Sequence, residues 1–510
     1  MNMNTSTFKS YCLCFCLITL CFWTPTYAAE QDNKTRAIEN PNMIQLSSEM
    51  IEQDVALLKE AYSRIHPGYT RYAKLEALEA AWDEIIIKSK RQGGMTLANF
   101  YLYVQDALTK IRCDHTKANL PKSIAQRRKQ QAVYLPFEWR WLENRAIVTQ
   151  VPQGSPLAVN DEIMSIDGRK ISEIVADVRD YTPVDGYTEW AKDTGVGASY
   201  EFMGGAVDHF GDLLWNYKAQ ATIEFVNSAS TLQTAQVSRV THPEWLAIIS
   251  TKDETGKALS NNFKDAVYFE QIDERTALLR VDTFVNYREP VKPEDIYTPI
   301  FKALKQNNTQ TLILDLRNNG GGSSDAMLGL FANLIQKKTS FIKDMTVATL
   351  DHDGLEEYLW SWDKRVINPN RLGFSSNDDG TYSLRSWFSD ELSMIKSEQY
   401  AFNGKVIALT SNSNGSASTN LLSVLKAKGR VTIVGEKTGG SAQGPNGGVL
   451  ITLRLPNSNI TTRIPVFKYS NNVKSFEFGM GLTPDVYAPM TVNALVNKQD
   501  PALESALSSL

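Results

Sequence analysis

Cysteine is scarce in this chain and is confined almost wholly to its N-terminus. Four of the five cysteines lie within the first 21 residues, and the fifth is Cys113. A chain that has lost this N-terminal segment therefore carries one cysteine and no internal disulfide bond. A disulfide-stapled fold is excluded, and 510 residues are ample for apolar cores in several domains.

Histidine is equally sparse, and no part of the chain is strongly basic. The five histidines are His66, His115, His209, His242 and His352. No two of them have a metal-ligand spacing, so the sequence does not favour zinc hydrolysis and implies no metal or cofactor. A net charge of -4 without a basic run gives no argument for nucleic-acid binding.

Only one long apolar run is present, and it lies at the N-terminus. Residues 11–23 follow Lys9 and precede a small-residue cleavage pattern that ends at Ala28. This pattern predicts a signal peptide over residues 1–28, and hence a periplasmic or secreted protein without stable membrane insertion after cleavage. An uncleaved anchor and a lipid site at Cys21 are the alternatives.

The N-terminal part of the remaining chain has helical periodicity. In "EMIEQDVALLKEAYSRIHPGY", Ile51, Val55 and Leu58 recur at helical spacing before a Pro-Gly stop. Two more runs, "KLEALEAAWDEIIIKS" and "TLANFYLYVQDALTKIR", have the same character. We expect a helical N-terminal domain over residues 29–130.

Short strands and turns follow over residues 131–245. The stretch "GSPLAVNDEIMSIDGRKI" resembles the part of PDZ domains in which a tight turn leads into two strands around an Asp-Gly hairpin. Such domains bind a peptide as an added strand at a sheet edge. The resemblance predicts a PDZ-like domain here.

Residues 246–510 alternate strand-like and helical runs, which predicts an α/β domain with a largely parallel sheet. The order includes "TALLRVDTF", "IYTPIFKALKQ", "QTLILDL", "KVIALT" and "RVTIVG". A segment at about residues 347–400, which contains Trp360 and Trp387, interrupts it. This insertion is either a lid or substrate wall, or a plain packed excursion.

Three stretches carry residues suited to chemistry. In "LILDLRNNGGGSSDAM" a strand enters a glycine loop that fits an oxyanion hole, an anion site or a tight turn, but lacks the lysine of a P-loop. In "SNSNGSASTN", Ser416 stands at a helix start, as a nucleophile or as a helix cap. In "TKIRCDHTKANL", His115 follows Asp114 after a helix and is either structural or a proton acceptor.

Taken in order, these stretches resemble peptidase family S41, the C-terminal processing and tricorn-core family of serine peptidases. "LDLRNNGG", the "SAST" serine motif, "GEKTGG", the upstream "DHT" and the late "GLTPD" match elements of its pattern. The resemblance covers most of residues 265–490. It implies a multi-domain α/β protein, with a crotonase-like α/β peptidase core beside the helical and PDZ-like domains.

The resemblance also assigns roles to particular residues. Ser416 matches the nucleophile, and the backbone amides of Gly321 and Ala417 match the oxyanion hole. The processing branch of the family uses a lysine as base, but its position here holds Ser441. Lys437 lies four residues too early, so a Ser–Lys mechanism is not favoured.

The tricorn-like branch uses a histidine as base, and His115 matches it. A carboxylate that orients this histidine is expected near the "GLTPD" element. Glu477 is the best match, although its spacing to Gly481 is one residue longer than in the family, and Asp114 is the alternative.

The sequence therefore predicts a secreted serine endopeptidase, or a tail- or oligopeptide-processing peptidase, with a Ser416–His115–Glu477 triad and a peptide or protein substrate. A catalytically inactive peptide-binding protein on the same fold is the alternative, suggested by the missing lysine and by Thr419 in place of a family glutamate. A nucleotide-binding α/β protein is the third and less favoured hypothesis. The oligomeric state is left open.

Overall fold

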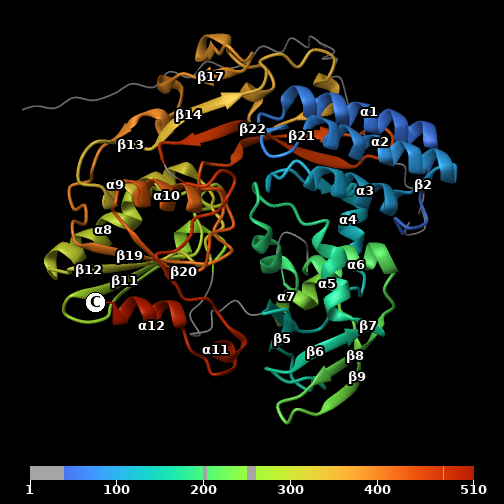
Figure 1. Cartoon of the computed structure of the whole chain (residues 1–510), viewed down its shortest axis with the longest axis horizontal. Coiled ribbons are helices and arrows are strands. Elements are labelled where there is room, and N and C mark those ends of the chain that lie inside the picture. The colour runs from blue at the N-terminus through green and yellow to red at the C-terminus, as the bar shows by residue number, and fades with distance from the viewer. Residues whose placement is uncertain (1–39, 199–203, 250–259, 475, 510) are drawn as a thin grey trace, which may run out of the picture. The chain divides into compact units, whose positions relative to one another are not determined.

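The computed structural model describes residues 40–198, 204–249, 260–474 and 476–509 (Figure 1). The predicted signal peptide, residues 1–28, lies outside these ranges. No helix in the described part of the chain combines the length and the apolar character that crossing a bilayer requires.

The three helical runs predicted near the N-terminus are helices α1, α2 and α3. Their bounds are Ser48–Ile65, Leu75–Gln92 and Leu97–Thr109, and a short α4 follows at Lys122–Arg128. Thr96 caps α3, because its hydroxyl accepts a hydrogen bond from the amide of Asn99. The chain leaving α3 forms the turn that contains His115 and then strand β3, Ala118–Asn119. Strand β3 pairs with a strand of the C-terminal half, β22, Thr461–Asn471.

The next region is an antiparallel sheet with helices packed against it. Its strands are β4 (Glu138–Leu142), β5 (Arg145–Gln150), β6 (Glu162–Ile166), β7 (Arg169–Lys170), β8 (Gln220–Val226) and β9 (Leu232–Ser238). Its helical segments are α5 (Ile171–Arg179), η1 (Glu189–Gly195), α6 (Ala206–Trp215) and α7 (His242–Ile248). The Asp-Gly hairpin is present, since Asp167 and Gly168 both have positive φ, 52° and 79°.

A six-stranded sheet forms the core of the C-terminal half. In spatial order its strands are β10 (Val267–Gln271), β11 (Thr276–Val281), β12 (Thr311–Asp315), β19 (Lys405–Thr410), β20 (Thr432–Gly435) and β23 (Val486–Tyr487). Every neighbouring pair is parallel except β10 with β11. The predicted α/β class with a largely parallel sheet is confirmed.

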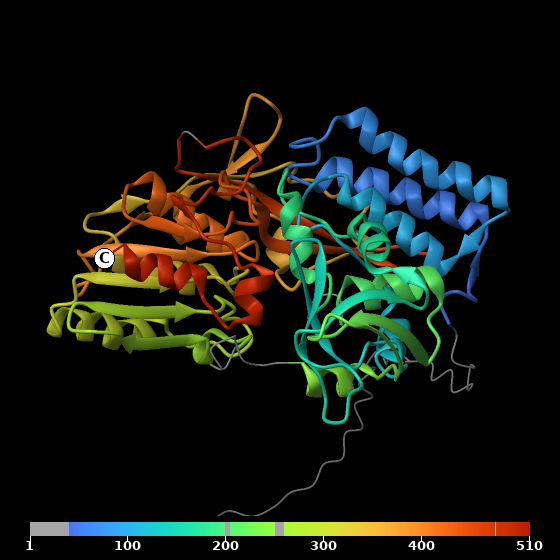
Figure 2. The same ribbon diagram turned by 60° about the horizontal axis from the view of Figure 1, so that its bottom comes forward.

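Both faces of this sheet are covered, which explains why its strands are continuous apolar runs. Alternate residues of β12 face opposite cores: Leu312 and Leu314 lie in one, Ile313 in the other. Helices α8 (Pro293–Gln306), α9 (Ser324–Leu334) and α10 (Ser416–Ala427) cover one face, and α12 (Pro501–Ser508) covers the other (Figure 1 and Figure 2). A short α11, Val492–Val496, precedes α12.

A second, seven-stranded sheet contains β22 and three short strands of the predicted insertion. Besides β3 and β22 its strands are β14 (Ile342–Val347), β15 (Leu359–Trp360), β16 (Phe374–Ser376), β17 (Tyr382–Leu384) and β21 (Asn446–Arg454). Two small pairs complete the strands: β1 (Gln45–Leu46) with β2 (Met95–Thr96), and β13 (Thr339–Ser340) with β18 (Met394–Ile395). Trp360 and Trp387 are exposed. A lid function of the insertion stays a prediction.

The parallel pairing of β12 with β19 decides where the candidate site lies. Asp315 and Leu409, near the carboxyl ends of the two strands, are register partners. The loops that leave these ends therefore start from the same edge of the sheet, which is where α/β folds place their ligand sites. One of these loops contains Gly321 and the other leads to Ser416.

Candidate active site

Ser416 is the first residue of α10, directly after the loop that follows β19. Asn414 fixes this loop, because its carboxamide donates to the carbonyl of Leu316 at 2.6 Å and accepts from the amide of Ser411 at 2.8 Å. Ser416 has a φ of 45°, in the left-handed region that side-chain-bearing residues seldom occupy. A strained serine at a strand–turn–helix junction is the arrangement in which hydrolases expose a nucleophile.

The strain at Ser416 gives a prediction about stability. Glycine removes the Cβ that disfavours this backbone, so Ser416→Gly should unfold with a free energy about 1 kcal/mol higher than Ser416→Ala. Both variants lose the hydroxyl. Equilibrium denaturant unfolding measures the difference.

The matched control is Ser505, inside α12, where the order should reverse because glycine is about 1 kcal/mol worse than alanine in a helix interior. If the Gly variant is the less stable one at both positions, the strain at Ser416 is not real.

The glycine loop packs directly against the nucleophile candidate. Gly321 has a φ of 115°, and a Cβ built on it would lie 2.7 Å from the Cβ of Ser416 and 3.1 Å from the amide nitrogen of Ala417. Only glycine permits this approach. The two predicted oxyanion-hole residues are thus adjacent in space.

The backbone amides of Ala417 and Gly321 differ in whether they are free to bind an oxyanion. The amide of Ala417 is in the first turn of α10, where helical amides have no partner within the helix, and it makes no hydrogen bond to another described residue. The amide of Gly321 already donates to Oδ1 of Asn319 at 2.9 Å. Asn319 is fully buried and in turn donates to the carbonyl of Val281. The Gly321 amide can serve an oxyanion only after it leaves Asn319.

His115 lies in the turn between α3 and β3 and is half-buried. His66 supports this turn through a 3.0 Å hydrogen bond between its Nε2 and the hydroxyl of Thr116. Burial lowers the pKa of His66 to about 3, so this ring stays neutral. A Cβ built on Gly447 would lie 3.5 Å from Cε1 and Nε2 of His115, so the ring packs against the start of β21.

Ser416 and His115 are not bonded to each other in this structure. The Nδ1 of His115 is buried without a hydrogen-bond partner, and Ser416 Oγ has none among the described residues. The segment of residues 440–447 nevertheless lies next to both the loop before Ser416 and the ring of His115. Gly440 donates its amide to the carbonyl of Asn414 at 2.8 Å, and Gly447, seven residues on, borders His115.

The two carboxylates predicted to orient His115 are not bonded to it. Glu477 is exposed, and its carbonyl rather than its side chain is engaged, accepting from Nε2 of Gln443 at 2.8 Å. The carboxylate of Asp114 is 3.1 Å from the ammonium of Lys117. Glu477 and Asp114 therefore stay predictions.

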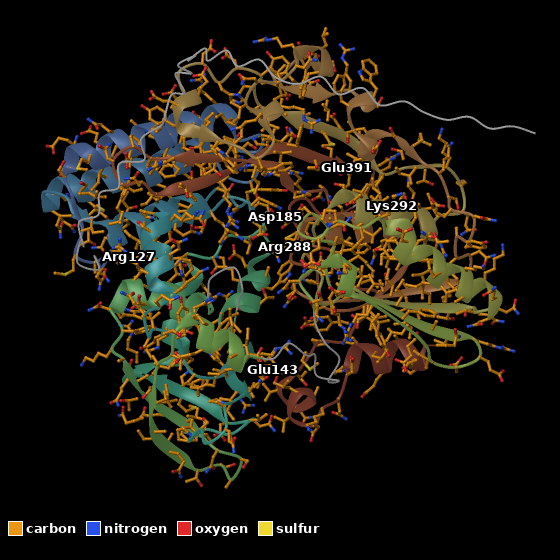
Figure 3. All side chains as sticks on the ribbon, turned by 180° about the vertical axis from the view of Figure 1, so that it is seen from behind. Arg127, Glu143, Asp185, Arg288, Lys292 and Glu391 are labelled. Atoms are coloured by element: carbon orange, nitrogen blue, oxygen red, sulfur yellow. The ribbon has the colours of Figure 1, made fainter. Side chains whose placement is uncertain are left out.

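A third carboxylate, Asp185, lies close to His115 and was not singled out by the sequence. It is 2% exposed and accepts a 3.0 Å hydrogen bond from the amide of Asp114. Ligand-type atoms of Asp185, His115 and Cys113 all lie within 4.8 Å of one another. Burial raises the pKa of the Asp185 carboxyl, while the positive charge of a protonated His115 opposes that rise. Figure 3 labels Asp185.

Backbone bonds hold the segment of Asp185 against the other site elements. The amide of Gly186 donates to the carbonyl of Arg112 at 2.9 Å, and that of Tyr187 to Gly479 at 2.8 Å. The hydroxyl of Thr188 donates to the carbonyl of Gly439 at 2.7 Å. Asp185 thus joins the His115 turn to the glycine turn after β20, although it belongs to the region between α5 and η1.

The structure places no lysine at the position of the processing-type base. Ser441 is buried, accepts a hydrogen bond from the hydroxyl of Tyr72 at 3.3 Å and donates to Oε1 of Gln443 at 3.0 Å. The ammonium of Lys437 lies 5.0 Å from the ring centre of Trp190. Ser441 is therefore a structural residue of the turn.

Cys113, His115 and Asp185 are also the one group of three metal-ligating side chains that the described ranges bring together. This group could not be predicted from the sequence, because the three residues do not form a local ligand motif. The thiol of Cys113, fully buried, donates weakly to the carbonyl of Asn446 at 3.7 Å.

Comparison with known proteins agrees with this arrangement. A model of peptidase family S41 matches residues 275–488, and a PDZ domain model matches residues 131–246. No curated protein matches the chain.

Three solved structures are similar to this chain, and the two with a TM-score of 0.59 show its fold. Mature CPAF is 15% identical with a TM-score of 0.59, covering 90% of this chain and 96% of its own. Mature CPAF complexed with lactacystin is also 15% identical at 0.59, covering 91% and 97%. The photosystem II D1 C-terminal processing protease is 15% identical at 0.40, covering 87% and 94%.

The family match covers the strands that carry the glycine loop and Ser416, and the CPAF likeness extends over the PDZ region and the peptidase core. Through residues 275–488 the chain belongs to peptidase family S41 and is a serine-type peptidase.

Proposed function

We propose that this protein cleaves peptide bonds through an acyl-enzyme formed on Ser416, with His115 as the general base. The observation that carries the proposal is the strained Ser416 at the start of α10, packed against Gly321 and beside the unpartnered amide of Ala417. A nucleophile and an oxyanion donor are thereby held on one edge of the parallel sheet.

In the first step Ser416 Oγ attacks the peptide carbonyl and its proton passes to His115. The carbonyl oxygen becomes an oxyanion that the amide of Ala417 stabilises, joined by Gly321 once that amide leaves Asn319. His115 then gives the proton to the departing amine as the C–N bond breaks. Water, deprotonated by the same ring, hydrolyses the ester and restores Ser416.

The His115 side chain must rotate toward Ser416 for this proton transfer, since the two are not bonded in this structure. The loops that carry Ser416 and His115 are fixed by buried hydrogen bonds. The movement that brings the two residues together must therefore come from their side chains and from the segment 440–447 between them. Catalytic hydrogen bonds that are long or absent without substrate commonly tighten when substrate binds.

Three carboxylates are candidates for supporting His115. The sequence predicts Glu477, with Asp114 as alternative, and the structure adds Asp185 as the buried carboxylate beside the ring. Because charge is most effective in a buried setting, Asp185 is the stronger stabiliser of a protonated His115.

We expect Asp185→Asn to lower kcat/KM by about 10–1000-fold, since a carboxylate that supports the histidine of a triad contributes up to about 10⁴. Asp114→Asn, which changes a half-exposed carboxylate paired with Lys117, is the matched control and should change kcat/KM less than about threefold. Steady-state cleavage of a fluorogenic peptide measures all variants. A larger loss in Glu477→Gln than in Asp185→Asn would instead assign the triad to Glu477.

The finer features of the predicted function are also proposals. Residues 1–28 act as a signal peptide and send the protein to the periplasm or outside the cell, 29–130 form the helical domain, 131–245 bind a peptide end, and 246–510 carry the peptidase. Mass determination of the exported protein should give a chain that begins at Ala29. An unprocessed mass in the exported fraction would contradict the assignment.

Cleavage itself is tested with an unfolded protein substrate. The wild type and Ser416→Ala are each incubated with reduced, alkylated casein, and the new peptide termini are identified by mass spectrometry. We expect new termini with the wild type alone. Binding of casein without cleavage by either form would indicate the inactive peptide-binding protein.

A further inference from the structure

Cys113, His115 and Asp185 form a compact group of three donors of different chemical types. A thiol, an imidazole and a carboxylate stand within 4.8 Å of one another, and the thiol makes only a weak hydrogen bond to the carbonyl of Asn446. Nδ1 of His115 is buried and has no hydrogen-bond partner among the described residues. An imidazole nitrogen in that state is costly unless something binds it.

We propose that these three side chains bind a zinc-type divalent ion that reversibly inhibits the peptidase. Sulfur, imidazole nitrogen and carboxylate oxygen are the ligand atoms zinc takes in proteins, at roughly 2.0–2.3 Å from the ion. A tetrahedral ion holds its ligand atoms roughly 3.3–3.8 Å apart at those bond lengths. The group therefore closes around an ion through shifts of about 1 Å or less.

Metal binding has a defined proton balance. As the metal–sulfur bond forms, the Sγ–H bond of Cys113 breaks and the proton leaves to solvent. His115 binds through the lone pair of one ring nitrogen, and Asp185 through a carboxylate oxygen. A water molecule fills the fourth position of the ion. No oxidation or reduction takes place.

Inhibition follows from the chemistry of the imidazole ring. A neutral imidazole has one nitrogen lone pair available and a hydrogen on the other nitrogen. Whichever nitrogen takes the metal, the other keeps its hydrogen and cannot accept the proton of Ser416. The ion also neutralises the charge of Asp185. Binding thus removes the base without blocking Ser416 directly.

Cys113 allows the metal site to be tested independently of catalysis. It has no step in the proposed mechanism, and serine is close to it in size while being a much poorer zinc ligand. Cys113→Ser should therefore keep the basal peptidase activity and lose the sensitivity to metal. Only the inhibition rests on the proposed function, because metal binding itself needs no catalysis.

The binding test uses cobalt(II) as a spectroscopic substitute for zinc, with the full mature chain carrying Ser416→Ala. We expect a thiolate-to-cobalt charge-transfer band and the visible bands of a tetrahedral ion, both displaced by zinc. The Ser416→Ala/Cys113→Ser variant should show neither, while its far-ultraviolet circular dichroism matches that of the parent. Absence of the charge-transfer band in the Ser416→Ala protein overturns the proposal.

The inhibition test uses the otherwise unmodified peptidase and a fluorogenic peptide. Zinc should inhibit the wild type, a chelator should restore it, and Cys113→Ser should need at least about tenfold more zinc for half-inhibition. Equal sensitivity of the two proteins overturns the proposal. If the chain cleaves no peptide at all, the proposed function fails, and the cobalt spectrum still decides whether the metal site exists.

Discussion

His115→Ala lowers kcat/KM for peptide cleavage by at least about 10³-fold, if the ring is the base that receives the proton of Ser416. The remaining groups, among them the amide of Ala417, still bind and polarise the carbonyl, so a small residual rate is expected. Steady-state kinetics with a fluorogenic peptide measure the loss, and circular dichroism verifies the fold.

The matched control is His352→Gln. His352 is buried and its Nδ1 bonds the carbonyl of Ile367 at 2.9 Å, away from the site elements, and glutamine can keep such a bond. Its activity should stay within about threefold of the wild type, as expected for a residue without contact to the reacting atoms. A loss below about tenfold in His115→Ala would place the base elsewhere in the chain.

Gly321→Ala is the second variant with a large expected effect. The new Cβ would meet Ser416 Cβ at 2.7 Å and the amide of Ala417 at 3.1 Å, and a φ of 115° is closed to alanine. The start of α10 must then shift, and a misplacement of about 1 Å at a reacting atom costs on the order of 10²-fold in rate. We expect kcat to fall at least that far.

Gly429→Ala is the control for backbone strain alone. Gly429 also has a positive φ, 65°, but nothing lies within 4 Å of a Cβ built on it. It should lose about 1 kcal/mol of unfolding free energy and keep its activity. Equal activity losses in the two variants would show that Gly321 acts through general stability and not through its approach to Ser416.

Much of the fold could be predicted from sequence because its signals are local. The continuous apolar runs of β12 and β19 indicated strands, and the helical spacing of Ile51, Val55 and Leu58 indicated α1. The serine at a helix start and the glycine loop could each be recognised within one short stretch of the sequence. Parallel neighbouring strands then bring Ser416 and Gly321 together without any further information.

The rest of the site depends on contacts between distant parts of the chain. Asp185 lies 71 residues from the amide of Asp114 to which it bonds, and "VDGY" reads as an ordinary turn. The occupation of the Gly321 amide by Asn319 is likewise a matter of tertiary geometry. Glu477 stays the prediction of motif spacing, and spacing alone does not show which buried segment packs beside His115.

Covalent capture of the nucleophile tests directly whether Ser416 is activated by His115. The mature protein is treated with a fluorophosphonate, and the modified residue is located by peptide mass spectrometry. We expect one phosphonyl adduct, on Ser416, that forms at least about 10³-fold more slowly in His115→Ala. An adduct on another residue, or rapid labelling of Ser416 without His115, would contradict it.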